Sequence, residues 1–177
     1  THIALPISSY GAQRFKASLP EGPAVYVDDA FAIVIFTKAG RQWMEAPYKA
    51  KVLSEETKTL GDVKVYVTTY ETLSLYINKT IVQRGSSLEV RYGVKAKEDA
   101  LLQRFQLSVW LAPGRMVSDA EVQDGKMLLV TDAGALEIAP VGEVLEMTCG
   151  LDEELRMSRI LISYSLKPAQ DEVSLTV

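Results

Sequence analysis

An alternation of apolar and polar residues between positions 62 and 111 constrains the fold of this chain more than any other feature. Four successive runs carry it, with apolar residues at Val63, Val65 and Val67, at Leu73, Leu75, Ile77 and Ile81, at Leu88, Val90, Tyr92 and Val94, and at Phe105, Leu107, Val109 and Leu111. Successive side chains of a β-strand point to opposite faces, so a period of two predicts strands that bury one face more deeply than the other. Such strands are typical of antiparallel sheets. Lys79 interrupts the second run.

Turn residues divide the rest of the chain into further short strands. Ala39-Gly40 separates the apolar run 31–37 from a return strand predicted over 42–48, and Asp124-Gly125 is a two-residue hairpin signal. We expect roughly ten to twelve strands in all, with little helix. Residues 1–23 contain scattered proline and glycine, which predict an irregular N-terminal arm with room for one short strand. The predicted class is therefore all-β, a single antiparallel β-sandwich domain spanning residues 1–177.

Length and composition limit the kinds of partner. The 177 residues are 47% hydrophobic and carry a formal net charge of −4, which fits one folded domain. An acidic balance without a basic stripe argues against sequence-independent binding of nucleic acid, which depends on releasing phosphate counterions. No apolar stretch approaches the roughly 20 residues of a membrane helix, so no membrane span is expected in this chain.

The beginning of the chain bears on where the protein works. Thr1 to Pro6 include no initiator methionine and no signal-peptide pattern, so we expect a processed protein or part of a longer one. An extracellular or cell-surface location is slightly favoured. Asn78 is the only asparagine and stands in the glycosylation sequon Asn78-Lys79-Thr80, which matters only in an exported protein. Scarce asparagine is typical of thermophilic sources and of some genome compositions.

Motifs for metals, cofactors and nucleophiles are missing from the sequence. His2 is the only histidine and falls in the predicted arm, which leaves no histidine cluster for a metal. Cys149 is the only cysteine, so no intrachain disulfide can form, and we expect it to be a small buried apolar residue. Glycine-rich phosphate loops and hydrolase motifs do not occur. We therefore expect neither a cofactor nor a metal.

Acidic side chains leave one enzymatic hypothesis open. Glycoside hydrolysis needs two carboxyl groups held roughly 5 to 10 Å apart. Glu71, Glu89 and Glu143 lie near predicted strands and are the acids to inspect. A solvated or ion-paired role is favoured for each over catalysis, because nothing in the sequence singles them out.

Aromatic residues on the polar parity of the strands give a lead to function. Five residues are the candidates for a binding face: Trp110, Tyr66, Tyr70, Arg104 and Gln106. A sheet face that mixes flat aromatic rings with hydrogen-bonding side chains suits a sugar, whose ring stacks while its hydroxyl groups are bound. The alternative is that a loop or a neighbouring sheet covers these aromatics, which are common in strands in any case.

One part of the chain resembles a known architecture. The successive segments Ile77–Ile81, Ser87–Tyr92, Phe105–Val109 and Leu111–Gly114 are similar to strands of the large antiparallel sandwiches in galactose-mutarotase-like and polysaccharide-processing proteins. The resemblance covers about a quarter of the chain. Those folds usually have more residues, and their epimerase members use histidines that this chain lacks. The resemblance implies a carbohydrate-associated accessory sandwich and carries over no catalytic residue.

Three functions remain open at this stage. The first is a non-catalytic domain of a larger or exported protein that binds a glycan. The second is a structural or protein-interaction module without a small ligand, which predicts a homodimer or a protein partner on an exposed edge strand or apolar patch. The third is the carboxylate-dependent enzyme.

Overall fold

The computed structural model describes residues 14–18, 24–28, 32–85, 87–111, 115–154, 156–166 and 172–176. Within these ranges the chain forms fifteen strands and one turn of 3₁₀ helix, η2 (Pro47–Lys49). The first sheet contains β1 (Arg14–Ser18), β2 (Ala24–Asp28), β3 (Ile33–Lys38), β4 (Arg41–Glu45), β9 (Leu101–Leu111), β13 (Glu143–Asp152) and β14 (Met157–Ser165). The second contains β5 (Lys51–Leu60), β6 (Val63–Glu71), β7 (Leu75–Arg84), β8 (Ser87–Ala96), β10 (Val117–Gln123), β11 (Lys126–Thr131), β12 (Gly134–Val141) and β15 (Glu172–Thr176).

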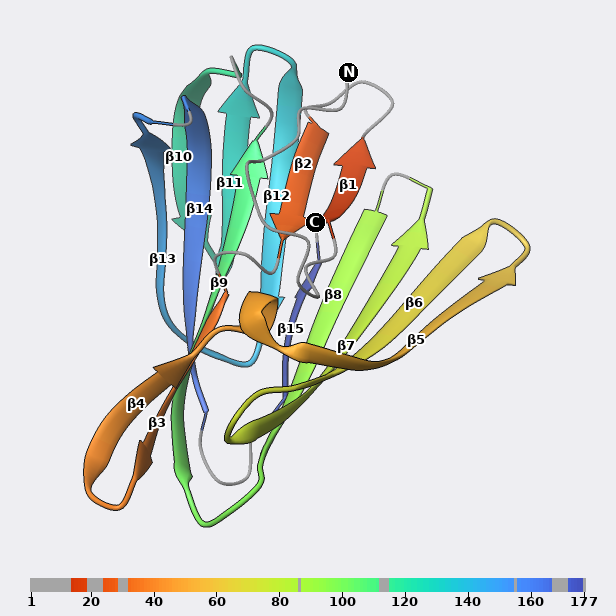
Figure 1. Cartoon of the computed structure of the whole chain (residues 1–177). Helices are drawn as coiled ribbons and strands as arrows, with labels where there is room; N and C mark the ends of the chain where they lie inside the picture. Colours follow the sequence, from red (N-terminus) through yellow and green to blue (C-terminus); the bar gives the residue numbers. More distant parts are fainter. Residues whose placement is uncertain are drawn as a thin grey trace.

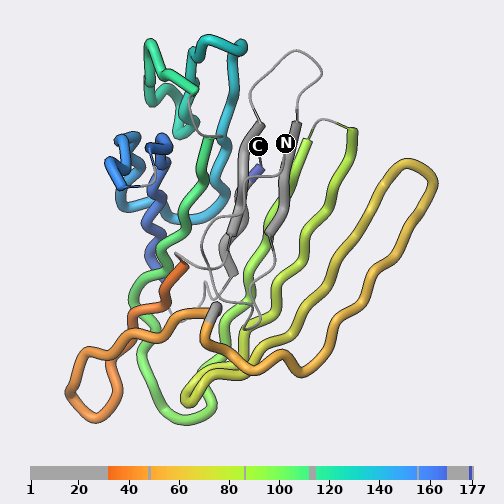
Figure 2. Tube along the Cα trace, turned by 45° about the horizontal axis from the view of Figure 1, so that its top comes forward, coloured from red at the N-terminus to blue at the C-terminus, as the bar shows by residue number. Residues whose placement is uncertain are grey.

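Every strand pairing is antiparallel. The first sheet has the order β1-β2-β9-β14-β13, and β3 pairs with both β9 and β4. The second has the order β10-β11-β12-β15-β8-β7-β6-β5. The β5–β6 ribbon projects away from the first sheet, as both views show (Figures 1 and 2). The predicted all-β antiparallel class is confirmed, with more strands than the ten to twelve expected. β1 is the short strand in the range 1–23; the other residues of that range lie outside the described part.

Tight turns form where the sequence predicts them. Ala39 and Gly40 have φ values of 52° and 75° and join β3 to β4, while Asp124 and Gly125 have the same values and join β10 to β11. Two successive positive φ angles define the type I′ turn, whose twist matches that of the flanking strands. The two hairpins predicted at these positions are confirmed.

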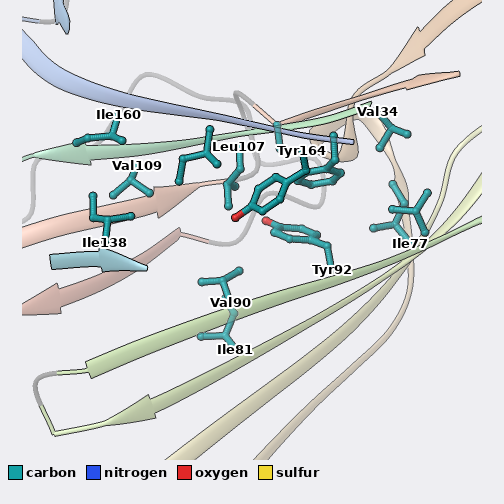
Figure 3. Close-up of a cluster of buried hydrophobic side chains, with 14 of the residues drawn as sticks. Val34, Ile77, Ile81, Val90, Tyr92, Leu107, Val109, Ile138, Ile160 and Tyr164 are labelled. Atoms are coloured by element: carbon teal, nitrogen blue, oxygen red, sulfur yellow. The ribbon is translucent and has the colours of Figure 1, made fainter. Parts of the chain in front are cut away.

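The core lies between the inner faces of the two sheets. β9 contributes Phe105, Leu107, Val109 and Leu111, the alternating residues that the sequence analysis assigned to its buried face. The Tyr92 ring on β8 lies 4.8 Å from the Phe105 ring, measured between centroids, and so joins the sheets. Tyr92 and Tyr164 reach into the space between the sheets from opposite sides, with their hydroxyl ends toward each other (Figure 3). Both rings are buried.

β6 turns inward the face that the sequence predicts to be polar. Tyr70 and Thr68 are buried, and Tyr66 packs against the core. The reason is the register with β7, which places these three residues opposite Ile77, Lys79 and Ile81. Residues directly opposite on paired strands share a face of the sheet, so the buried face of β7 determines that of β6. The valines of β6, at positions 63, 65 and 67, are half-buried on the other face.

Candidate functional site

The five predicted binding residues do not lie on one surface. Trp110, Arg104 and Gln106 are on β9 in the first sheet, while Tyr66 and Tyr70 are on β6 in the second. Arg104 is exposed and Gln106 is half-buried. The structure therefore brings together two partial sets on different sheets rather than one face.

Trp110 is fully buried although it points away from the core residues of β9. The guanidinium carbon of Arg159, on the neighbouring strand β14, lies 5.4 Å from the centroid of the Trp110 ring. Arg159 Nε also donates a hydrogen bond of 2.9 Å to Ser108 Oγ. Solvent does not reach the indole, so the alternative interpretation of a covered aromatic applies here.

Tyr70 is covered as well, by the core itself. Its ring is fully buried, and Lys79 Nζ lies 5.4 Å from the ring centroid. A sugar arriving from solvent has no access to the face of this ring. Tyr66 is half-buried on the same inner face.

Glu71 and Glu89, two of the acids to inspect, form ion pairs. Glu71 Oε2 lies 3.4 Å from Lys97 Nζ, and Glu89 Oε1 lies 2.8 Å from Arg91 Nη2. Glu143 is half-buried at the start of β13. The ion-paired role favoured for Glu71 and Glu89 is confirmed. Within the described ranges, no three His, Cys, Asp or Glu side chains are grouped closely enough to hold a metal ion.

Cys149 is half-buried and packs against the core, and this burial raises the pKa of its thiol. A raised pKa lowers the thiolate fraction, which is the reactive form. Among the described residues no helix has the length and apolar character needed to span a bilayer.

An exposed tryptophan, Trp43 on β4, lies between two hollows that share it as a wall. The first hollow, of about 470 Å³, is lined by Glu45, Lys49, Thr72 and Leu73 among others. The second, of about 380 Å³, is lined by Lys38, Arg41, Leu73, Ser74 and Glu98 among others. We call these two hollows, with Trp43 and Leu73 between them, the Trp43 groove.

The β3–β4 hairpin explains why this indole is exposed. The register pairs Trp43 with Phe36 and Glu45 with Val34, so these side chains share one face of the hairpin. Phe36 and Val34 are fully buried because β3 also pairs with β9. Among the described strands β4 pairs with β3 alone. The same face therefore extends past the sheet edge, and Trp43 remains 43% exposed. The hairpin extends from one end of the molecule (Figure 1).

Glu45 fixes the opposite wall of the groove. Its carboxylate accepts hydrogen bonds from Thr72 Oγ1 at 2.6 Å and from the Ser74 amide at 3.0 Å. Thr72 Oγ1 in turn accepts a hydrogen bond of 3.0 Å from the Leu75 amide. These contacts anchor the β6–β7 turn to β4, and the turn presents Leu73, which is 79% exposed, to the groove.

Charges are unevenly neutralised along the second hollow. Lys38 Nζ lies 2.6 Å from Glu98 Oε2, and this hydrogen bond and charge lower the pKa of the Glu98 carboxyl. Arg41 is exposed and makes no ion pair with any residue that the structure describes. The arrangement offers a flat aromatic surface, an apolar side chain, and donors and acceptors on both sides.

Comparison with known proteins finds a distant structural likeness. No family model matches the sequence, and no curated protein matches it. Among solved structures the chain is similar to a protein described as "Putative kojibiose phosphorylase from human microbiome", with 11% sequence identity and a TM-score of 0.48. The similarity covers 94% of this chain and 25% of that one, so the chain spans a quarter of that protein's length. The resemblance to galactose-mutarotase-like proteins stays a prediction.

Proposed function

We propose that this domain binds carbohydrate in the Trp43 groove. The observation that carries the proposal is an indole 43% exposed between two hollows whose walls bear charged and hydroxyl groups. The C–H face of a sugar ring packs on an aromatic face, while the surrounding polar side chains bind its hydroxyl groups. Trp43 thus takes the role that the sequence assigns to Trp110.

The shape of the groove favours a chain of sugars over a single one. Its two hollows, of about 470 and 380 Å³, both fall within the roughly 300–1,000 Å³ typical of ligand sites. Because Trp43 and Leu73 line both, a ligand stacked on the indole extends into each hollow. An oligosaccharide or polysaccharide segment has that extended form.

The rigidity of the far wall supports binding. Glu45 ties down the β6–β7 turn through Thr72 and Ser74 before any ligand arrives. A wall that is already ordered does not lose conformational entropy on binding, so more of the contact energy contributes to affinity.

The carboxylates at the groove favour binding over hydrolysis. Glu45 is already engaged by Thr72 and Ser74, and Glu98 by Lys38. A general acid in glycoside hydrolysis needs a raised pKa, whereas the pKa of Glu98 is lowered. We therefore propose a non-catalytic carbohydrate-binding domain.

A glycan array followed by calorimetry on the best ligand tests this proposal. Trp43→Ala should weaken binding at least about tenfold, which corresponds to about 1.4 kcal/mol. Leu60→Ala is the matched control, because it removes another exposed apolar side chain, at the tip of the β5–β6 hairpin. Its affinity should equal that of the wild type. An array without any bound glycan, or a Trp43→Ala variant that binds normally, would contradict the proposal.

A protein-interaction role has one observation in its favour. β5 ends the second sheet, and all but one of its ten residues are exposed, so its outer backbone edge is available for strand pairing. The strand also carries Glu55, Glu56 and Lys58 and a register shift between Val52 and Ser54, features that discourage edge pairing. This role therefore ranks second. Analytical ultracentrifugation would favour it only if a dimer forms that Glu56→Lys disrupts.

A further inference from the structure

We infer that the Trp43 groove selects an acidic polysaccharide, with a uronic acid carboxylate bound by Arg41. The inference rests on the proposed function and specifies its ligand class. It follows from the balance of charge in the second hollow, from the chemistry of the guanidinium group, and from the spacing of Arg41 and Trp43 on one strand.

The charge balance leaves Arg41 as the cation available to a ligand in the second hollow. Lys38 is neutralised by Glu98 at 2.6 Å. Arg41 lines the same hollow, is exposed, and pairs with no acid among the described residues. The other acid of the groove, Glu45, directs its oxygens to Thr72 and Ser74. A local positive charge in a chain of net charge −4 favours an anionic ligand at this place.

The guanidinium group favours a carboxylate. Its planar array of donors matches the two oxygens of a carboxylate and forms two parallel hydrogen bonds with them. A uronic acid carries such a group on the sugar ring itself. Sulfated sugars are the other source of negative charge, and the experiment below includes them as a separate comparison.

The spacing lets one ligand use both residues. The register of the hairpin places Arg41 opposite Lys38 and Trp43 opposite Phe36, so Arg41 and Trp43 share a face of β4. Residues two apart on one face are separated by roughly 6.5–7 Å along a strand. A long arginine side chain spans that distance, so it reaches a carboxylate on the sugar stacked on Trp43 or on the next sugar.

The test compares charged polymers with their neutral counterparts. Affinities of the wild-type domain are measured by calorimetry for polygalacturonate, alginate and hyaluronate, and for the carboxyl-reduced form of each. The wild type should bind at least one of the acidic polymers about tenfold more tightly than its reduced form, and the difference should shrink as salt is added.

Four variants then locate the preference. Arg41→Gln should bind the acidic and the reduced polymer with equal, weak affinity. Arg41→Lys should keep part of the preference for the acidic polymer, because it retains the positive charge but lacks the planar donor array of the guanidinium group. Trp43→Ala should lose its affinity for both the acidic and the reduced polymer. Arg84→Gln is the charge-matched control, since Arg84 is exposed at the end of β7 far from Ser74, and it should behave as the wild type.

The outcomes separate this inference from the proposed function. If the reduced polymers bind as well as the acidic ones and Arg41→Gln changes nothing, the inference is wrong while the effect of Trp43→Ala still supports glycan binding. If dextran sulfate binds as tightly as the best uronate and Arg41→Gln weakens both equally, the carboxylate assignment is wrong. If no polymer binds in any form, the inference is wrong, and the glycan array decides separately whether the proposed function stands.

Discussion

Glu45 and Thr72 are joined by a hydrogen bond of 2.6 Å that runs from Thr72 Oγ1 to Glu45 Oε2. Glu45 belongs to the first sheet and Thr72 to the β6–β7 turn of the second, so the bond links the two sheets next to the Trp43 groove. The same carboxylate accepts a hydrogen bond from the Ser74 amide, and neither Glu45 nor Ser74 is fully exposed to water. Hydrogen bonds to a charged group are among the stronger ones in proteins.

Removing this link should destabilise the protein and distort the groove. Glu45→Ala is expected to lower the free energy of unfolding by about 1–3 kcal/mol, because it leaves the Thr72 hydroxyl and the Ser74 amide without their acceptor. Urea denaturation measures the loss. Glu56→Ala, at an exposed glutamate whose carboxylate lies 3.9 Å from Lys58 Nζ, is the control and should change stability by less than about 0.5 kcal/mol.

A double-mutant cycle isolates the bond itself. Glu45→Ala removes the acceptor of the hydrogen bond, and Thr72→Val removes its donor hydroxyl. The effects of the two substitutions on the free energy of unfolding should therefore be coupled by about 0.5–3 kcal/mol. Strict additivity of the two losses would show that the contact contributes no stability.

Lys79 is a buried lysine, and we expect its stem and its ammonium group to have opposite effects on stability. Its side chain is almost fully buried on the inner face of β7, and Nζ lies over the Tyr70 ring. Lys79→Ala should cost roughly 2–5 kcal/mol, because a long buried side chain is replaced by a cavity. Lys79→Met keeps most of the stem and removes a buried charge, so it should cost much less or stabilise the fold. Thermal unfolding of both variants decides the matter, and equal losses would show that the charge is the stabilising part.

The buried phenol of Tyr164 should make stability fall at alkaline pH. Burial raises its pKa well above the ordinary value, so the folded chain keeps the proton while the unfolded chain loses it near pH 10. A raised pKa contributes stability that is complete below about pH 10 and is lost as the pH rises above it. The free energy of unfolding should therefore decline by up to about 1.4 kcal/mol per pH unit for this one proton.

Tyr164→Phe tests the pH dependence directly. The variant has no proton to lose at this position, so its stability should decline less steeply than that of the wild type between pH 10 and about 12. Urea denaturation at a series of pH values gives both curves. Between pH 6 and 8 the difference between the two proteins should be constant, which serves as the internal control. Parallel curves above pH 10 would contradict the role assigned to Tyr164.

Alternation alone predicted where the strands lie, but it did not always predict which face of a strand is buried. On β9 the residues that pack in the core are Phe105, Leu107, Val109 and Leu111, as the pattern required. On β6 both parities carry residues that a sheet interior accepts, valines on one and tyrosines with threonines on the other. The choice between them is made by the register with β7. That register is a tertiary property, so the β6 sequence by itself favours the wrong face.

The Trp43 groove could not be predicted from alternation because it depends on contacts distant in the sequence. Trp110 does point away from the core residues of β9, but facing away from the core did not mean facing solvent. Trp43 is exposed because, among the described strands, β4 pairs with β3 alone, and the groove beside it is completed by Leu73, thirty residues later. The available signal was its place on the return strand of a short hairpin, among Arg41, Gln42 and Glu45. A tryptophan among polar residues on an edge hairpin is a candidate for exposure.

The two tryptophans should report separately on the ligand and on the core. Trp43 is 43% exposed and Trp110 is fully buried, so acrylamide should quench the emission of the first and hardly affect the second. A glycan stacked on Trp43 should shift the wild-type emission to the blue and protect it from acrylamide. In Trp43→Phe the remaining emission comes from Trp110 and should respond to neither acrylamide nor glycan. A ligand that changes the fluorescence of Trp43→Phe as much as that of the wild type would place its binding site elsewhere in the chain.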